Sequence, residues 1–212
     1  MMMTTLLTRS ASMADQPSVL GAIRDEACNL AIWQRAAVAD FTPLTSGAPQ
    51  DLRFETSLAD LPGALRSGLA ENGFAGDALH DILIADAALL ARLFCEVLEL
   101  ARFELRLEIV RSDSCRRFHA DYVRARLITT YVGAGTDWLE DDDAARIAAG
   151  AEPRSIHRMN AFDVGLFKGK LATDRPAIHR SPPIAGTGAA RVLMVLNPAQ
   201  KQLVDRADSA IS

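Results

Sequence analysis

Three side chains in the second half of the chain have the types and the spacing to hold one metal ion. His119 and Asp121 are two residues apart, so in an extended strand they project to the same side. His179, in a second apolar stretch, would complete a set of two histidines and one carboxylate. This set is the facial triad of non-haem Fe(II) oxygenases, which leaves coordination positions open for substrates. The pattern predicts a metal site, although a His-x-Asp pair also arises by chance among ordinary strand residues.

The third ligand is the least constrained member of this set, because its spacing from the first two varies. His157 is the rival of His179, but it lies in a polar segment, whereas His179 lies in an apolar one. Cys115, four residues before His119, supports a different interpretation. With sulfur, nitrogen and oxygen ligands the site would be a closed Zn²⁺ site with a structural or sensing role.

One buried cation is predicted near the C-terminal end. Residues 189–196 are apolar on both strand faces apart from Arg191, so the strand should be central and its guanidinium should need an anion. The anion would be a carboxylate of 2-oxoglutarate, held bidentately, or an internal carboxylate such as Asp163. Thr129 and Tyr131 have the strand parity of the predicted metal ligands. Their hydroxyls would bind the same cosubstrate carboxylate or simply pack.

Composition and charge narrow the class of protein. The 212 residues are 49% hydrophobic and 24% charged, which is typical of one soluble globular domain. The formal charge of -4 argues against non-specific binding to nucleic acid or to an acidic membrane. Between Arg154 and Arg191, however, seven Lys/Arg face only two Asp/Glu. This local excess favours a small anionic substrate or cosubstrate.

The cysteines and the N-terminus indicate the compartment. Cys28, Cys95 and Cys115 are too few and too widely spaced for a disulfide framework, which predicts a reducing, cytoplasmic location. Cys95 is expected to pack in a helix as a small apolar residue. No apolar run approaches the length of a membrane span, and the first residues lack the apolar core of a signal peptide.

Apolar periodicity predicts helices in the first half of the chain and strands in the second. The predicted helices cover 58–71, 77–102 and 144–151. The predicted strands cover 103–109, 117–123, 126–132, 162–168, 177–180 and 189–197. The acidic run 140–143 is expected to be a solvated loop.

This order predicts an α+β fold with one structural domain. Residues 1–17 would be a flexible leader, 18–102 a mainly helical part, 103–198 a β-rich metal-binding core and 199–212 a loose tail. A double-stranded β-helix, the jelly roll of cupins, brings ligands from different strands to one mouth. We therefore expect such a core with the N-terminal helices packed on one of its sheets.

The motifs of the β-rich half carry two resemblances. Phe-His-Ala-Asp, Thr-Tyr-Val-Gly-Ala-Gly-Thr-Asp-Trp-Leu, Leu-Phe-Lys-Gly and His-Arg-Ser-Pro-Pro-Ile resemble an uncharacterised bacterial family of unknown function, often encoded near zinc-homeostasis genes. Their order, with an arginine twelve positions after the distal histidine, is similar to that of the Fe(II)/2-oxoglutarate dioxygenase superfamily. The second resemblance implies that His119, Asp121 and His179 bind iron and that Arg191 binds the cosubstrate.

Three hypotheses of function follow. The first is an oxidoreductase that uses Fe(II), 2-oxoglutarate and O₂ to hydroxylate or demethylate a small molecule or a peptide. The second is a non-catalytic zinc-binding or zinc-delivery protein that uses Cys115, His119, Asp121 and His179. The third is a cupin-like module that has kept the barrel without its chemistry. The sequence indicates neither the substrate nor the oligomeric state.

Overall fold

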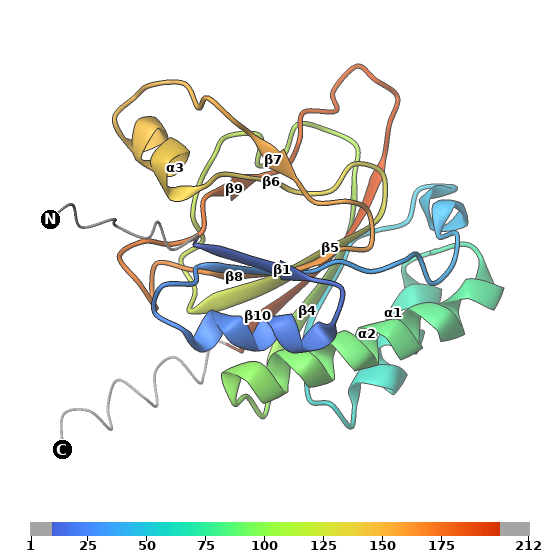
Figure 1. Ribbon diagram of the computed structural model, residues 1–212. Coiled ribbons are helices and arrows are strands. Elements are labelled where there is room, and N and C mark those ends of the chain that lie inside the picture. Colours follow the sequence, from blue (N-terminus) through green and yellow to red (C-terminus); the bar gives the residue numbers. More distant parts are fainter. Residues whose placement is uncertain (1–9, 200–212) are drawn as a thin grey trace, which may run out of the picture.

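The computed structural model describes residues 10–199, which form a mixed α/β fold around a large, mainly antiparallel sheet (Figure 1). Its seven strands run in the order β1-β2-β8-β5-β10-β4-β3. The strands are β1 (Ala11–Ala14), β2 (Leu30–Trp33), β3 (Leu52–Thr56), β4 (Phe103–Val110), β5 (Ala125–Val132), β8 (Val164–Lys168) and β10 (Arg191–Pro198). Only β1 and β2 are parallel neighbours.

A second, three-stranded sheet lies over one face of the large sheet (Figure 1). Its order is β7-β6-β9, with β6 at Asp137–Trp138, β7 at His157–Arg158 and β9 at His179–Arg180. An isolated antiparallel bridge joins His119 to the outer edge of β9. Apolar residues of β2, β5 and β8 fill the space between the two sheets with Trp138 and Met159.

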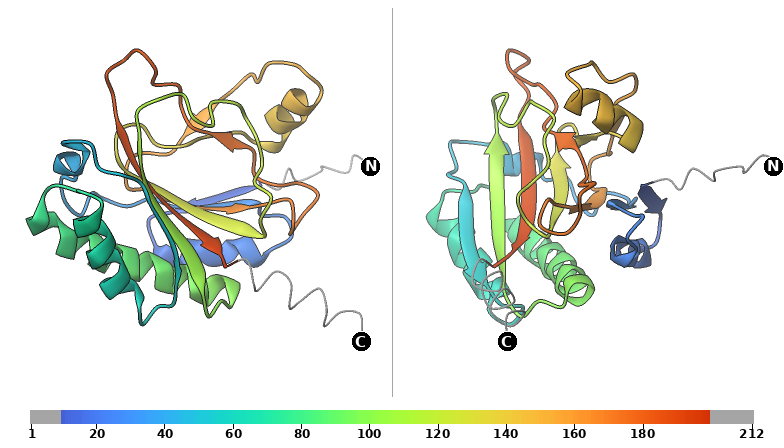
Figure 2. Two further views of the ribbon diagram at one scale, coloured as in Figure 1. Left: turned by 180° about the vertical axis from the view of Figure 1, so that it is seen from behind. Right: turned by 90° about the vertical axis from the view of Figure 1, so that its left-hand side faces the viewer.

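Three helices cover the opposite face of the large sheet (Figure 2). They are the 3₁₀ helix η1 (Pro17–Arg24) and the α-helices α1 (Leu61–Glu71) and α2 (Asp77–Leu98), while a short 3₁₀ turn, η2 (Thr42–Thr45), lies beside them. Helix α2 packs one apolar stripe, Leu83, Ala87, Leu90, Ala91 and Phe94, against the sheet. Burial of each larger side chain in this stripe contributes about 1.5–3 kcal/mol.

Strands β4 and β10 show how the large sheet packs against the helices on one face and the small sheet on the other. Phe103, Leu105 and Leu107 of β4 are buried in the helical layer, whereas Arg106 and Glu108 face the small sheet. Strand β10 pairs with β4 on one side and with β5 on the other, so it is central, as its two apolar faces predict. The alternating pattern of β4 predicted from the sequence is confirmed.

The structure differs from the expected elements in several places. Residues 11–14 of the predicted leader form β1, and β2 and β3, in the part predicted to be mainly helical, extend the sheet toward its two edges. The strand predicted over 117–123 is reduced to the single bridge at His119. The acidic run is no loop, because it opens α3 (Asp141–Ala148), where carboxylates favour a helix N-terminus. Residues 1–9 and 200–212 of the predicted leader and tail lie outside the described residues.

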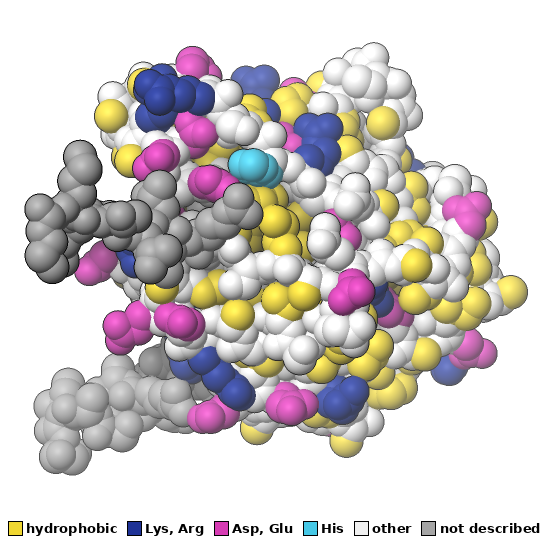
Figure 3. Space-filling view, in the orientation of Figure 1, with side chains coloured by type: hydrophobic (Ala, Val, Ile, Leu, Met, Phe, Trp, Pro, Cys, Tyr) yellow, Lys and Arg dark blue, Asp and Glu magenta, His cyan; other side chains and the backbone are white. Residues whose placement is uncertain are grey.

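The surface carries mixed charges. On the face shown in Figure 3, Lys and Arg side chains alternate with Asp and Glu side chains and do not form one broad patch of a single sign. Within residues 10–199, no helix is long and apolar enough to cross a lipid bilayer.

Candidate metal centre

A backbone bridge brings His119 and His179 together, although they are sixty residues apart in the chain. The amide of each residue donates to the carbonyl of the other over 3.0 Å, which is the hydrogen-bonded pair of an antiparallel ladder. Side chains of such a pair project to the same face, and the two imidazole centroids are 4.8 Å apart. This pairing accounts for the convergence of the two rings.

Asp121 completes the group. One ligand atom from each of His119, Asp121 and His179 lies within 4.8 Å of the others. The Nε2 of His179 is 3.3 Å from Asp121 Oδ2, and the Nε2 of His119 is 3.8 Å from Oδ1. The side chain of His179 is 4% exposed and that of His119 is 36% exposed, so the group opens to solvent on the His119 side.

Both imidazole rings are oriented by their other nitrogen. His119 Nδ1 is 2.9 Å from the carbonyl oxygen of Arg117, and His179 Nδ1 is 3.1 Å from that of Ala177. A carbonyl oxygen only accepts, so each Nδ1 carries a proton and Nε2 is the ring nitrogen that remains for a ligand. Both Nε2 atoms lie beside Asp121, and an Nδ1 held by a carbonyl oxygen is common around metal-binding histidines.

The carboxylate of Asp121 is held on one side only. Arg126 Nη1 donates to Oδ1 over 2.5 Å, whereas the buried Oδ2 lies 3.3 Å from His179 Nε2 without a well-aligned hydrogen bond among the described residues. Burial alone would raise the pKa of Asp121, but the adjacent His179 and Arg126 hold it below its usual value. The carboxylate is therefore ionised at neutral pH, with its buried Oδ2 facing His179 Nε2.

Two cavities meet at this group. A cavity of about 80 Å³ lies between the sheets and is lined by His119, His179, Arg126 and Ser181, among others. A more open hollow of about 380 Å³ adjoins it and shares His119 and Cys115. The inner cavity gives a ligand access to both imidazoles, and the outer hollow connects the group with solvent.

Arg191 lies next to the inner cavity, behind Ser181. It is 1% exposed and donates to the carbonyl of Ala134 (2.6 Å), to Ser181 Oγ (2.6 Å) and to Thr130 Oγ1 (3.2 Å). Burial lowers its pKa to about 10. Among the described residues it forms no ion pair, and Asp163, its predicted internal partner, instead accepts a backbone amide. The guanidinium is therefore buried without a counter-ion at contact distance.

The structure does not bring Thr129 and Tyr131 to the site. Both lie on the helical side of the sheet, where the Tyr131 hydroxyl donates to Asp86 over 2.7 Å. The chain between Asp121 and Ala125 is not a strand, so strand parity cannot be carried from the metal group into β5. Thr130, their neighbour, is the β5 hydroxyl that contacts Arg191.

The two rival ligands lie outside the group. His157 stacks on Trp138, with centroids 4.5 Å apart, and its Nε2 is 3.9 Å from Glu140. Cys115 lines both cavities, but its sulfur is not within the distance that defines the three-residue group. Its φ of +57° is unusual for a residue other than glycine, and its carbonyl accepts the amide of Ser181 over 3.0 Å.

Several residues of the site were missed by sequence reasoning. Arg106 and Arg126 face the inner cavity from β4 and β5, and Arg180 reaches it beside Phe118, whose ring lies 4.3 Å from the guanidinium. Charged residues on the polar face of a strand are usually solvated. Arg106 and Arg126 become part of the site because the small sheet lies over that face and encloses the cavity. The one available signal was that Arg106 alternates with buried leucines in β4.

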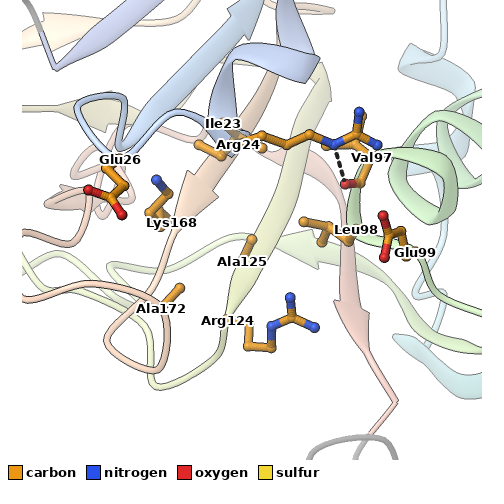
Figure 4. A pocket seen from close by; sticks show the side chains of 10 residues that line it. All are labelled: Ile23, Arg24, Glu26, Val97, Leu98, Glu99, Arg124, Ala125, Lys168 and Ala172. Carbon is orange, nitrogen blue, oxygen red and sulfur yellow. Dashed lines mark hydrogen bonds between the residues drawn. The ribbon is translucent and has the colours of Figure 1, made fainter.

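A separate cavity of about 340 Å³ lies at the far end of α2, between η1 and the ends of β5 and β8 (Figure 4). Arg24 donates there to the carbonyl of Val97 over 3.1 Å, and Lys168 donates to the carbonyl of Asp25 over 2.8 Å. Neither histidine of the metal group nor Asp121 lines it. Its cations therefore hold η1 to α2 and β8 rather than belonging to the metal group.

The three cysteines give a prediction that tests where the sulfur of Cys115 lies. Cys28 and Cys95 are buried, Cys115 is exposed, and burial raises the pKa of the Cys95 thiol to about 11. We expect one thiol of the folded protein to react with dithionitrobenzoate at pH 8, and this reaction to vanish in Cys115→Ser. Added Zn²⁺ should leave its rate unchanged. Protection of the thiol by Zn²⁺ would instead place sulfur on the metal.

Comparisons with known proteins give the chain a family but no activity. It belongs to a family of proteins of unknown function, DUF1826, which matches residues 14–197. Membership of a family of unknown function is thus confirmed, while the link to zinc-homeostasis genes stays a prediction. A search of curated proteins gives no match.

Three solved structures illustrate what the chain is similar to. A prolyl-4-hydroxylase from Pseudomonas putida is 14% identical, with 86% of this chain and 94% of that chain covered and a TM-score of 0.43. AviO1 from Streptomyces viridochromogenes is 11% identical, with 88% and 96% covered and a TM-score of 0.44. A bsmA homolog from Methylobium petroleophilum is 17% identical, with 86% and 95% covered and a TM-score of 0.41.

Proposed function

We propose that this protein is an Fe(II)- and 2-oxoglutarate-dependent oxygenase that acts on a small molecule or a peptide. The observation that carries the proposal is the convergence of two imidazoles, each with Nδ1 against a backbone carbonyl, on the carboxylate of Asp121. Two neutral nitrogen donors and one anionic oxygen on a single face suit Fe(II) and leave its other positions open.

The order of the strands supports a double-stranded β-helix as the scaffold. From β4 onward the chain visits the large sheet, the His119 bridge, β5, then β6 and β7 of the small sheet, β8, β9 and β10. Within the large sheet these strands have the order β8-β5-β10-β4, and the small sheet with its bridge has the order β7-β6-β9-His119; this alternation supports the interleaving expected of a jelly roll. In this scaffold the metal group lies between the sheets, at one open end.

Arg191 supports the choice of cosubstrate. Its charge is buried without a contacting counter-ion among the described residues, and Ser181, which it contacts, lines the cavity between the two histidines. The distal carboxylate of 2-oxoglutarate would be received by Arg191 with Ser181 and Thr130. Arg191 is thereby proposed as the cosubstrate anchor, as the sequence predicts.

The residues of the chain have separate tasks in this proposal. His119, Asp121 and His179 would hold Fe(II), which with 2-oxoglutarate and O₂ supplies the oxidising chemistry when bound. Arg126 keeps Asp121 in place through Oδ1, and the carbonyls of residues 117 and 177 keep the protons on Nδ1. The small sheet covers His179 and excludes water from that side of the group. A cytoplasmic location is part of the same proposal, since Fe(II) and free thiols persist in reducing surroundings.

Anaerobic titration of Fe(II)-loaded protein with 2-oxoglutarate tests the proposal. We expect a stoichiometric complex with a visible charge-transfer band, and succinate release once O₂ is admitted. Arg191→Gln should weaken 2-oxoglutarate binding by about tenfold or more, because it removes a charge-assisted hydrogen bond. Arg191→Lys keeps the charge and controls for folding, and Arg66→Gln, in an exposed surface pair with Asp81, serves as a remote control. Iron-loaded protein that binds no 2-oxoglutarate would refute the proposal.

A further inference from the structure

Two guanidinium groups, those of Arg106 and Arg126, lie beside the metal group on the floor formed by the large sheet. Arg106 comes from β4 and Arg126 from β5, the two strands that flank β10. Their side chains are 28% and 19% exposed. Both side chains line the same two cavities, so the two positive charges lie near one another.

The carboxylates around this pair are already engaged. Glu108 is paired with Arg106, and Asp121 is paired with Arg126. Glu104 accepts from Arg53 over 2.8 Å and from Asn197 over 2.9 Å. Asn197 in turn accepts from Arg126 Nε over 2.7 Å, so a continuous row of contacts crosses β5, β10, β4 and β3. This row fixes the position of Arg126.

The pair separates two cavities and faces both. Arg106 and Arg126 line the inner cavity that holds His119 and His179. They also line a second cavity of about 180 Å³, whose other walls include Arg53, Tyr122 and two glutamates, Glu55 and Glu104. A group bound between the two guanidiniums would therefore lie next to the metal group, with the rest of its molecule in the second cavity. That volume is below the roughly 300–1,000 Å³ of pockets for drug-sized ligands, so it suits a small molecule.

Metal binding would strengthen the demand for an anion at this place. Asp121 is the carboxylate that balances Arg126, and a divalent ion bound to Asp121 would add positive charge next to both guanidiniums. An anion from the ligand would restore the balance, and the planar fork of arginine matches a carboxylate well. Arg191 lies behind Ser181 and does not line the inner cavity. It is therefore a basic position distinct from the Arg106 and Arg126 pair.

We propose that Arg106 and Arg126 form a subsite that binds a carboxylate of the primary substrate, which makes the substrate a small carboxylic acid. The inference rests on the proposed function, which assigns the cosubstrate to Arg191 and leaves the Arg106 and Arg126 pair for the substrate. Arg106 is the residue to vary, because Arg126 also holds the metal-binding carboxylate.

Calorimetric titration with malonate tests the subsite. Protein is loaded with Mn²⁺, saturated with 2-oxoglutarate and titrated with malonate, and the titration is repeated on metal-free protein and with inorganic phosphate. We expect Arg106→Gln to weaken malonate binding by about tenfold or more while 2-oxoglutarate binding changes less than about threefold. Glu108→Gln should do the opposite and tighten malonate binding, because it removes the internal competitor for Arg106. Arg66→Gln, whose side chain is 58% exposed in a surface pair with Asp81, is the control.

The outcomes separate this inference from the proposed function. Equal weakening in Arg106→Gln and Glu108→Gln would assign the pair a structural role only and overturn the subsite. Loss of 2-oxoglutarate rather than malonate in Arg106→Gln would make the pair the cosubstrate anchor, which also overturns it. Tighter binding of phosphate than of malonate would contradict the proposal that the subsite selects a carboxylate. If the protein binds no Mn²⁺ or 2-oxoglutarate, the proposed function fails, yet Arg106-dependent malonate binding to metal-free protein would still support the subsite.

Discussion

His179→Ala is expected to weaken the binding of Fe(II) or Co(II) by more than about a hundredfold. Loss of an outer contact to a metal ligand alone costs about ten- to a hundredfold in affinity, and this variant removes a ligand. Asp121→Asn should have a similar effect, because it replaces the anionic donor by a neutral one. Dissociation constants come from titration of metal-free protein with Co(II), followed by its visible absorption.

The matched control is His157→Ala, which removes the other candidate histidine. His157 lies outside the three-residue group, so its variant should bind Co(II) as the native protein does. His179 is buried and its ring lies 4.6 Å from that of Phe167, so thermal unfolding of the metal-free variants must confirm that they fold. Native affinity in a folded His179→Ala variant would exclude this metal centre. Loss of Co(II) affinity in His157→Ala would mean that the metal binds at His157 and not at the three-residue group.

The two-residue spacing predicted that His119 and Asp121 share a face, and their ligand atoms lie within 4.8 Å of each other, although the strand predicted for this segment is reduced to one bridge. Their meeting with His179 depends on a single backbone bridge between remote segments, which no local pattern encodes. The choice of His179 over His157 came from the apolar character of its segment, and that segment is indeed buried between the sheets. The apolar character of the segment therefore indicated which histidine lies near the pair, whereas the residue spacing did not.

The failures have equally specific causes. Thr129 and Tyr131 were expected at the site because parity was carried through residues 122–124, where the strand is interrupted. Strand β1 has four small or flexible residues with no periodic signal, and its pairing with β2 is imposed by tertiary contacts. Elements with a strong apolar periodicity, such as α2 and β4, were predictable from the sequence. Elements that depend on pairing with a neighbouring strand, such as β1, were not.

A buried polar network on the helical side of the sheet was also missed, although the sequence contains its signal. Asp86 lies in the apolar stripe of α2, where a carboxylate needs a partner. Arg35 donates to its two oxygens over 2.5 and 2.9 Å and to the carbonyl of Phe162 over 2.8 Å. The Tyr131 hydroxyl donates to the same carboxylate, and burial raises the pKa of Tyr131 well above its usual value. The network joins the segment after β2 to α2 and β5.

Asp86→Ala is expected to lower the free energy of unfolding by about 3–5 kcal/mol, because it leaves the buried guanidinium of Arg35 without its counter-ion. The side chains of Asp86 and Arg35 are 4% and 7% exposed, so water cannot replace the lost contacts. Asp81→Ala on the same helix is the matched control. Its pair with Arg66 is exposed, and the change should stay within about 1 kcal/mol. Urea unfolding followed by tryptophan fluorescence measures both. A cost below about 1 kcal/mol for Asp86→Ala would mean that the network is dispensable and that apolar packing alone holds α2 to the sheet.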